Sequence, residues 1–213
     1  MLKPVVGFLL LLLLLPLSAP AAPVSCQTLT RLQDYLDQSP SGGCFVQDKL
    51  FTGFSYAGGG GVTADQIGVD VVFASFLGND IHGFVFFPSA VWTSDFALGY
   101  TITIDPPTAG TSITGAELAG NFGISQNPAF AESTKSNGLV LDVAFGSNSD
   151  SAVFAGVQSL TSLTVVTIPT LGFLISLEET YVQTIGTVPE PATLALVSLG
   201  LAGLAALRRR KQQ

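Results

Sequence analysis

Charge is scarce in this 213-residue sequence, in which 11% of the residues are charged and only eight are lysine or arginine. The 15 acidic residues give a formal net charge of −7, which argues against binding to the phosphate backbone of nucleic acids. One histidine and two cysteines supply too few ligands for most His/Cys metal sites. Because 47% of the residues are hydrophobic, however, a disordered chain is also excluded. We therefore expect a folded protein.

The first 21 residues have the features of an export signal. Lys3 supplies one positive charge, residues 5–17 form an apolar run, and Ala19-Pro20-Ala21 is a small-residue cleavage triplet. The run is short for a membrane span, which needs about 20 residues. We predict a signal peptide at 1–21 and a mature chain that starts at Ala22. The alternative is an uncleaved membrane anchor.

A second apolar run occupies residues 192–207, and Arg208, Arg209, Arg210 and Lys211 follow it. As a helix this run is ~24 Å long, and snorkelling arginines can make up the difference to a ~30 Å hydrocarbon core. We predict a transmembrane helix whose basic end stops translocation and stays in the cytoplasm. Residues 22–187 would then lie on the opposite, non-cytoplasmic side of the membrane, in agreement with the export signal.

The tripeptide Pro189-Glu190-Pro191 directly precedes this helix. Tripeptide, helix and basic end together resemble a PEP-CTERM sorting signal, here at residues 188–213. The resemblance implies an exported protein of a Gram-negative-type bacterium that makes extracellular polysaccharide. It also implies processing by exosortase, an integral-membrane cysteine protease-like enzyme. Independently, the two prolines keep the segment extended, as a processing enzyme requires. The alternative is that the tripeptide only interrupts structure before the helix.

The two cysteines, Cys26 and Cys44, both fall in the exported part, where an oxidising compartment favours a disulfide. Between them, an apolar residue recurs at helical spacing, which predicts a short amphipathic helix from Thr28 to Gln38. Residues 39–43 are rich in Gly, Pro and Ser and let the chain fold back. We predict a Cys26–Cys44 disulfide that closes residues 22–44; two reduced thiols are the alternative. The helix prediction rests on Leu29, Leu32 and Leu36, with Thr30 and Gln33 as a capping pair.

A second resemblance covers residues 43–56, whose pattern is GC-x-x-x-DK-L-F-x-x-F-x-Y. It is similar to the opening of a subset of exported PEP-CTERM proteins with β-rich domains. This subset implies a placement in the envelope and no particular chemistry.

From Phe45 onward the apolar residues recur with period two, and clusters of Gly, Asn, Asp and Pro separate the runs. This pattern is typical of an antiparallel β-sandwich. We therefore predict a mainly β fold between Phe45 and Ile185, after one short N-terminal helix. Asn137-Gly138 predicts a hairpin, and residues 58–61 predict a flexible hairpin tip. The side chains expected to face inward are Ile67, Val69, Val71, Phe73, Ile102, Leu141 and Val143.

Signatures of hydrolases and of phosphate-binding loops are missing from the sequence. His82 could form an acid–base pair with Asp80, although a structural histidine is the simpler interpretation. Glu178 and Glu179 are neighbours on a predicted strand, so their side chains should point to opposite faces. The sequence therefore predicts no catalytic residue, no metal ligand and no cofactor.

Two groups of residues still suggest binding. Asp142, Asn148 and Asp150 offer oxygen ligands for Ca²⁺, but their spacing matches no EF-hand loop. Aromatic residues could instead form a stacking platform for sugars, although in a sandwich they are more often part of the core. The aromatic residues considered are Trp92, Tyr56 and Tyr100.

Two functions remain open. The first is a non-catalytic envelope or surface protein, held in the inner membrane before processing, then at the cell surface or outside the cell, and linked to extracellular polysaccharide or biofilm matrix. The second is a carbohydrate-binding module for the producer's own exopolysaccharide. The expected partners are exosortase and the membrane, with polysaccharide as a third. Residues 22–188 contain 14 acidic and three basic residues, and this surplus favours solubility without identifying a ligand.

Overall fold

The computed structural model describes residues 22–184 apart from 77, 108–109 and 124–128, and all structural statements concern these residues. The predicted signal peptide at 1–21 lies outside them. So does the predicted sorting segment at 188–213, with its membrane helix at 192–207. Within the described part, the helices are all too short to span a membrane.

Most of the described chain is β-strand. The α-helix α2 spans Leu32–Gln38, and short 3₁₀ helices lie at Cys26–Thr28 (η2), Ser39–Ser41 (η3) and Ala64–Gln66 (η4). The strands are β1 (Val24–Ser25), β2 (Cys44–Val46), β3 (Lys49–Gly58), β4 (Ile67–Phe76), β5 (Asn79–Pro88), β6 (Phe96–Ile104), β7 (Ser112–Phe122), β8 (Phe130–Lys135), β9 (Val140–Ala144), β10 (Ser149–Val157), β11 (Ser159–Thr167) and β12 (Leu174–Thr184).

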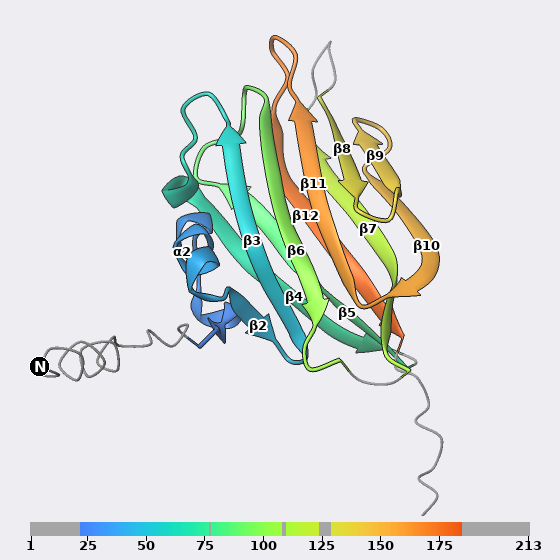
Figure 1. Cartoon of the computed structure of the whole chain (residues 1–213). Helices are drawn as coiled ribbons and strands as arrows, with labels where there is room; N and C mark the ends of the chain where they lie inside the picture. Colours follow the sequence, from blue (N-terminus) through green and yellow to red (C-terminus); the bar gives the residue numbers. More distant parts are fainter. Residues whose placement is uncertain (1–21, 77, 108–109, 124–128, 185–213) are drawn as a thin grey trace, which may run out of the picture.

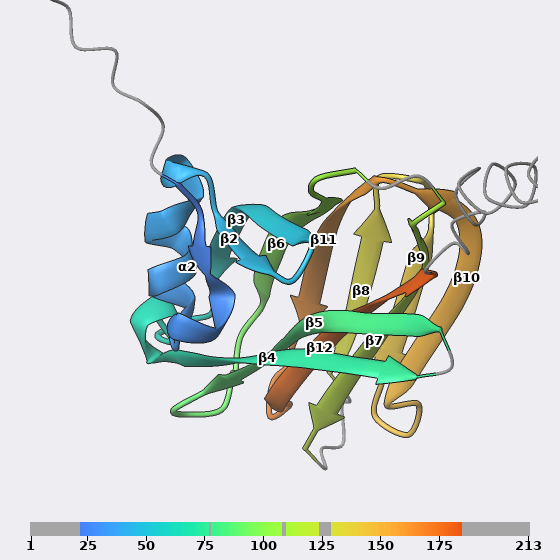
Figure 2. The same cartoon turned by 90° about the horizontal axis from the view of Figure 1, so that it is seen from below.

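The strands form two sheets that lie face to face (Figures 1 and 2). One sheet has seven strands in the order β1-β2-β3-β6-β11-β8-β9, and the other has five in the order β10-β7-β12-β5-β4. The mainly β fold with a short N-terminal helix is therefore confirmed. The pairing is not antiparallel throughout, because β1 runs parallel to β2, with Val24 opposite Cys44. The disulfide segment, rather than a hairpin, brings these two strands together.

Aromatic side chains fill the space between the sheets. Phe51 of β3 meets Phe84 of β5 edge to face at 4.7 Å, and Phe54 stacks on Tyr100 of β6 at 5.3 Å. Such aromatic pairs contribute about 0.5–1.5 kcal/mol beyond the burial of their area. A bulge at Gly53, where φ is +65°, lets both Phe51 and Phe54 point inward although they are three residues apart. A strict period of two would have exposed one of them.

At both side edges of the stack, elements connect the two sheets. At one edge α2 contacts β3 of the larger sheet and β4 of the smaller one. Its Tyr35 ring lies 5.0 Å from Phe54 and 5.4 Å from Phe84, so the helix belongs to the same core. At the opposite edge β9 contacts β10 (Figure 2).

The period-two pattern identified most of the inward-facing residues. Five of the seven are at most 4% exposed, and Val71 is partly buried against the core. Phe73 is an exception, because 43% of it is exposed. It lies on β4, the outermost strand of its sheet, and the last four residues of this strand are all exposed. Phe73 does lie on the inward-facing side of β4, opposite His82, but it is left partly exposed rather than enclosed in the core as predicted. The five buried residues are Ile67, Val69, Ile102, Leu141 and Val143.

The helix begins four residues later than predicted, at Leu32. The backbone before it is extended because it pairs with β4: Arg31 forms a bridge with Gly68, and the Thr30 carbonyl accepts a hydrogen bond from the Val69 amide at 3.0 Å. The predicted Thr30–Gln33 capping pair is also wrong. Instead, Asp34 Oδ2 accepts hydrogen bonds from the backbone amides of Thr30 and Arg31 at 3.1 and 3.0 Å.

Two predicted turns had different outcomes. Asn137-Gly138 does connect the antiparallel strands β8 and β9, as predicted. Residues 58–61 are not a hairpin tip, because β3 pairs with β6 and β4 pairs with β5 in the other sheet. This glycine-rich segment instead carries the chain from one sheet to the other.

Candidate functional sites

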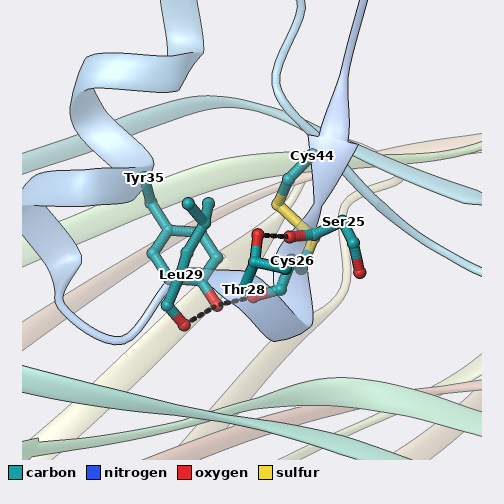
Figure 3. The surroundings of a disulfide bond; sticks show 6 residues. All are labelled: Ser25, Cys26, Thr28, Leu29, Tyr35 and Cys44. Carbon is teal, nitrogen blue, oxygen red and sulfur yellow. Dashed lines mark hydrogen bonds between the residues drawn. A yellow bond between two sulfur atoms is a disulfide. The ribbon is translucent and has the colours of Figure 1, made fainter.

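The N-terminal opening of the exported part is closed by the predicted disulfide. Cys26 of η2 and Cys44 of β2 are bonded, their Cα atoms are 4.9 Å apart, and neither residue is exposed. The Tyr35 hydroxyl donates a hydrogen bond to the Cys26 carbonyl at 2.9 Å (Figure 3). Burial raises the pKa of Tyr35, so this hydroxyl keeps its proton. Disulfide and tyrosine together attach the helix to the first strands of the larger sheet.

His82, the one histidine, is 1% exposed and lies on the inner face of β5. Its ring stacks on Phe73 at 5.8 Å, and among the described residues neither ring nitrogen has a hydrogen-bond partner. Burial lowers the pKa of His82 to about 4, and the nearby charge of Lys49 adds to this effect. The suggested pair with Asp80 is not formed, because the Asp80 carboxylate accepts a hydrogen bond from Ser75 Oγ at 2.5 Å. His82 is thus a neutral interior side chain.

Lys49 of β3 is fully buried and forms an ion pair with Asp48, whose side chain is 34% exposed. The other Asp48 oxygen, Oδ2, accepts a hydrogen bond from Gln183 Nε2 of β12 at 3.1 Å. Burial lowers the pKa of Lys49. Burial acts to raise the pKa of Asp48, but hydrogen bonds from Lys49 and Gln183 outweigh it and hold that pKa below its usual value. This polar cluster connects the two sheets near one end.

A second interior cluster surrounds Lys135 of β8 and Glu179 of β12. The two side chains form an ion pair between the sheets, and they are 0% and 1% exposed. Lys135 Nζ also donates to Ser133 Oγ at 2.8 Å and to Ser162 Oγ at 2.7 Å, and it lies 5.1 Å from the ring centroid of Tyr181. Burial lowers the pKa of Lys135 to about 7 and raises that of Tyr181 to about 12.

This cluster was not predicted from the sequence, but the opposite orientation of Glu178 and Glu179 was. Glu179 is buried while Glu178 points to the other face of β12, as alternation on a strand requires. The available signal was the phase of β8, in which Ala131, Ser133 and Lys135 share the buried face. A lysine on the same buried face of a strand as an alanine needs a polar or charged side chain to bind it, and the opposite sheet must supply that side chain.

The suggested sugar-stacking platform is not formed. Trp92 and Tyr100 are each 1% exposed, and Trp92 stacks on Phe96 with 4.6 Å between ring centroids. Trp92 Nε1 donates a hydrogen bond to the Tyr56 hydroxyl at 3.2 Å. Trp92 and Tyr100 therefore belong to the core, and Tyr56 packs against it as a partly buried side chain.

Among the described residues, the two suggested aspartate ligands of Ca²⁺ belong to no group of three acidic side chains that could hold a metal ion. Asp150 Oδ2 accepts a hydrogen bond from the backbone amide of Asp142 at 3.0 Å, which joins β10 to β9. Within residues 22–184, apart from the gaps, no three His, Cys, Asp or Glu side chains gather in a way that could hold a metal ion.

An open groove of about 560 Å³ lies where the N-terminal segment crosses β4. Arg31, Asp65, Asp70 and Phe87 are among its lining residues, and Phe87 is 40% exposed. The Phe87 ring lies across Gly68, where an added Cβ atom would come within 2.3 Å of it. The groove thus combines an exposed aromatic ring with two carboxylates and a guanidinium.

A comparison with protein families identifies the C-terminal segment. Residues 187–211 match the family described as the PEP-CTERM protein-sorting motif. The chain carries a PEP-CTERM sorting signal. The matched residues include Pro189-Glu190-Pro191 and the basic residues 208–211, all outside the described part of the structure. A search of curated proteins finds no match to the chain. The PEP-CTERM signal implies an exported protein that exosortase processes.

Proposed function

We propose that this chain is a non-catalytic envelope protein that exosortase sorts to the cell surface, where it is linked to extracellular polysaccharide or biofilm matrix. The observation that carries the proposal is the position of the PEP-CTERM match. Strand β12, the last one in the described part of the chain, ends at Thr184, and the match begins at residue 187. The folded domain is therefore joined directly to its sorting signal, and it would be the cargo that the signal delivers.

In this proposal residues 1–21 direct export, residues 22–187 form the displayed domain, and residues 192–207 hold the precursor in the inner membrane. The interior chemistry supports a non-catalytic role. The groups whose pKa values are lowered most, His82 and Lys135, are buried between the sheets, away from solvent. A catalytic acid or base would instead have to be within hydrogen-bond reach of a bound substrate.

The proposal is tested by following the protein in hosts with and without exosortase. We expect the precursor to stay in the membrane fraction without exosortase and to mature with it. Changing Pro189, Glu190 and Pro191 together to alanine should block maturation and leave membrane insertion intact, because residues 192–211 are unchanged. Changing Thr193 and Ser198 to alanine is a matched control within the signal. If the tripeptide variant matures like the unaltered protein, the sorting role is refuted.

The groove beside Arg31 favours the carbohydrate-binding alternative. An exposed Phe87 ring can stack on the apolar face of a sugar, while Asp65 and Asp70 can accept hydrogen bonds from its hydroxyls. Arg31 adds a donor for a carboxylate-bearing sugar.

A pull-down of the mature protein with the producer's exopolysaccharide tests this alternative. Phe87→Ala should weaken binding about tenfold, which corresponds to the loss of one stacking contact. Phe76→Ala is the matched control, because Phe76 is 69% exposed on the same sheet but does not line the groove. Equal binding by both variants would exclude the groove as the sugar site.

A further inference from the structure

The side chains of Lys135 and Glu179 meet between the two sheets, where a covalent bond would link one sheet to the other. Lys135 belongs to β8 of the seven-stranded sheet, and Glu179 belongs to β12 of the five-stranded sheet. Lys135 Nζ contacts Glu179 Oε1 directly, and both side chains are shielded from solvent. The two chain segments are 44 residues apart in sequence. A bond between them would therefore connect the two halves of the fold.

The surroundings of Glu179 concentrate hydrogen-bond donors on one carboxyl oxygen. Ser133 Oγ donates to Glu179 Oε1 at 2.8 Å, and Ser162 Oγ donates to the same atom. Thr164 Oγ1 supports this arrangement by donating to Ser133 Oγ at 2.8 Å. Fixed donors directed at one oxygen stabilise the negative charge that develops there when a nucleophile attacks the carboxyl carbon.

We propose that Lys135 and Glu179 form an intramolecular isopeptide bond. The reaction needs no external reagent. Inside the dry core the ammonium of Lys135 transfers a proton to the Glu179 carboxylate, which gives a neutral amine and a carboxylic acid. Lys135 Nζ then attacks Glu179 Cδ, and Ser133 and Ser162 stabilise the oxyanion. The Nζ–Cδ bond forms, the C–OH bond breaks, and one water molecule leaves with a proton from the nitrogen.

Two physical effects favour this step at Lys135. Removal from water disfavours the charged amine, in agreement with the lowered pKa of Lys135. The fold also holds the two groups in contact, and such intramolecular positioning lowers the barrier relative to a bimolecular reaction. The product amide is neutral, so the cost of keeping two charges in a low-dielectric interior disappears.

The other buried lysine supplies an internal comparison. Lys49 is also fully buried, but its partner Asp48 is the preceding residue and is one-third exposed. The Asp48 carboxylate is held by Gln183 and is open to water, which favours the ionised form. We expect no covalent bond at Lys49.

Mass spectrometry of the protein purified from its host, after reduction of the disulfide and proteolysis, tests the proposal. We expect a linked peptide pair from β8 and β12 whose mass is the sum of the two peptides less one water molecule. Lys135→Arg and Glu179→Ala should each give two separate peptides, whether or not the variants fold. Peptides around Lys49 should be unlinked. Separate β8 and β12 peptides of full mass in the unaltered protein would overturn the proposal and leave an ion pair only.

Discussion

The ring of Phe73 stacks on His82 at 5.8 Å with an angle of 27° between the ring planes. Phe73 and His82 are direct partners in the β4–β5 pair, so the exposed phenylalanine shields the buried imidazole. This contact explains how a histidine near the end of an edge strand pair stays neutral.

Stability should therefore fall in mild acid. The pKa of His82 is about 4 in the folded protein and 6.5 in the unfolded chain, so the unfolded chain binds the proton first. This contribution is fully present above pH 6.5 and is lost as the pH falls towards 4, by up to about 3 kcal/mol. Urea unfolding at several pH values measures it. His82→Phe keeps the aromatic stack and should reduce the difference in unfolding free energy between pH 6.5 and 4. An unchanged slope would contradict this account.

Shielding by Phe73 gives a related prediction. Phe73→Ala should open His82 to solvent and raise its pKa towards the usual value, because desolvation is the main cause of the shift. The imidazole resonances in an NMR titration report this pKa directly. Phe76→Ala, at an exposed position on the same strand, is the control and should leave the titration unchanged. An unshifted His82 titration in Phe73→Ala would show that other residues exclude the water.

The disulfide should contribute substantially to stability. Cys26 and Cys44 are 18 residues apart, and closing a loop of this length contributes about 3 kcal/mol in the chain-entropy model. We expect the double change of Cys26 and Cys44 to alanine to lower the free energy of unfolding by about this amount. Reducing the unaltered protein separates the loss of the bond from the loss of side-chain volume. A loss well below 1 kcal/mol in both experiments would contradict the prediction.

The partners in the Lys135 cluster should depend on each other. Lys135→Met leaves Glu179 buried without its cation and should destabilise the protein by about 3–5 kcal/mol. Adding Glu179→Gln to this variant removes the uncompensated charge and should restore part of the loss, whether the pair is ionic or covalent. Chemical denaturation of both variants measures the difference. Equal or greater destabilisation in the double variant would contradict the predicted coupling.

Trp92 should report on the core. It is the one tryptophan of the chain, is 1% exposed and stacks on Phe96. We expect its emission to be blue-shifted in the folded protein and to shift to the red on unfolding. Because it lies outside the groove beside Arg31, soluble sugars should leave the emission unchanged. A solvent-exposed spectrum for the folded protein would contradict its burial.

Local patterns in the sequence predict much of this fold. Alternation identified Ile67 and Leu141 as core residues, and the environment outside the cell together with the chain reversal identified the Cys26–Cys44 pair. The patterns failed where distant segments decide the outcome. The start of α2 differs from the prediction because Arg31 pairs with Gly68, and Phe73 is partly exposed because β4 is an edge strand.

The interior polar clusters were the least predictable part of the candidate sites. Lys135 and Glu179 have no signal in common along the sequence, because their contact depends on which strands of the two sheets face each other. The sorting signal is the opposite case, since its tripeptide, apolar run and basic end are contiguous. It was identified from the sequence, and the family comparison confirmed it.

The central claim is that the folded domain is cargo for a PEP-CTERM sorting signal. Mass spectrometry of the C-terminal peptide of the mature protein, isolated from a host with exosortase and from the same host without it, tests this claim most directly. We predict a C-terminus near Pro189-Glu190-Pro191 when exosortase is present and an intact tail through Gln213 when it is absent. The same C-terminal peptide in both hosts would contradict the account.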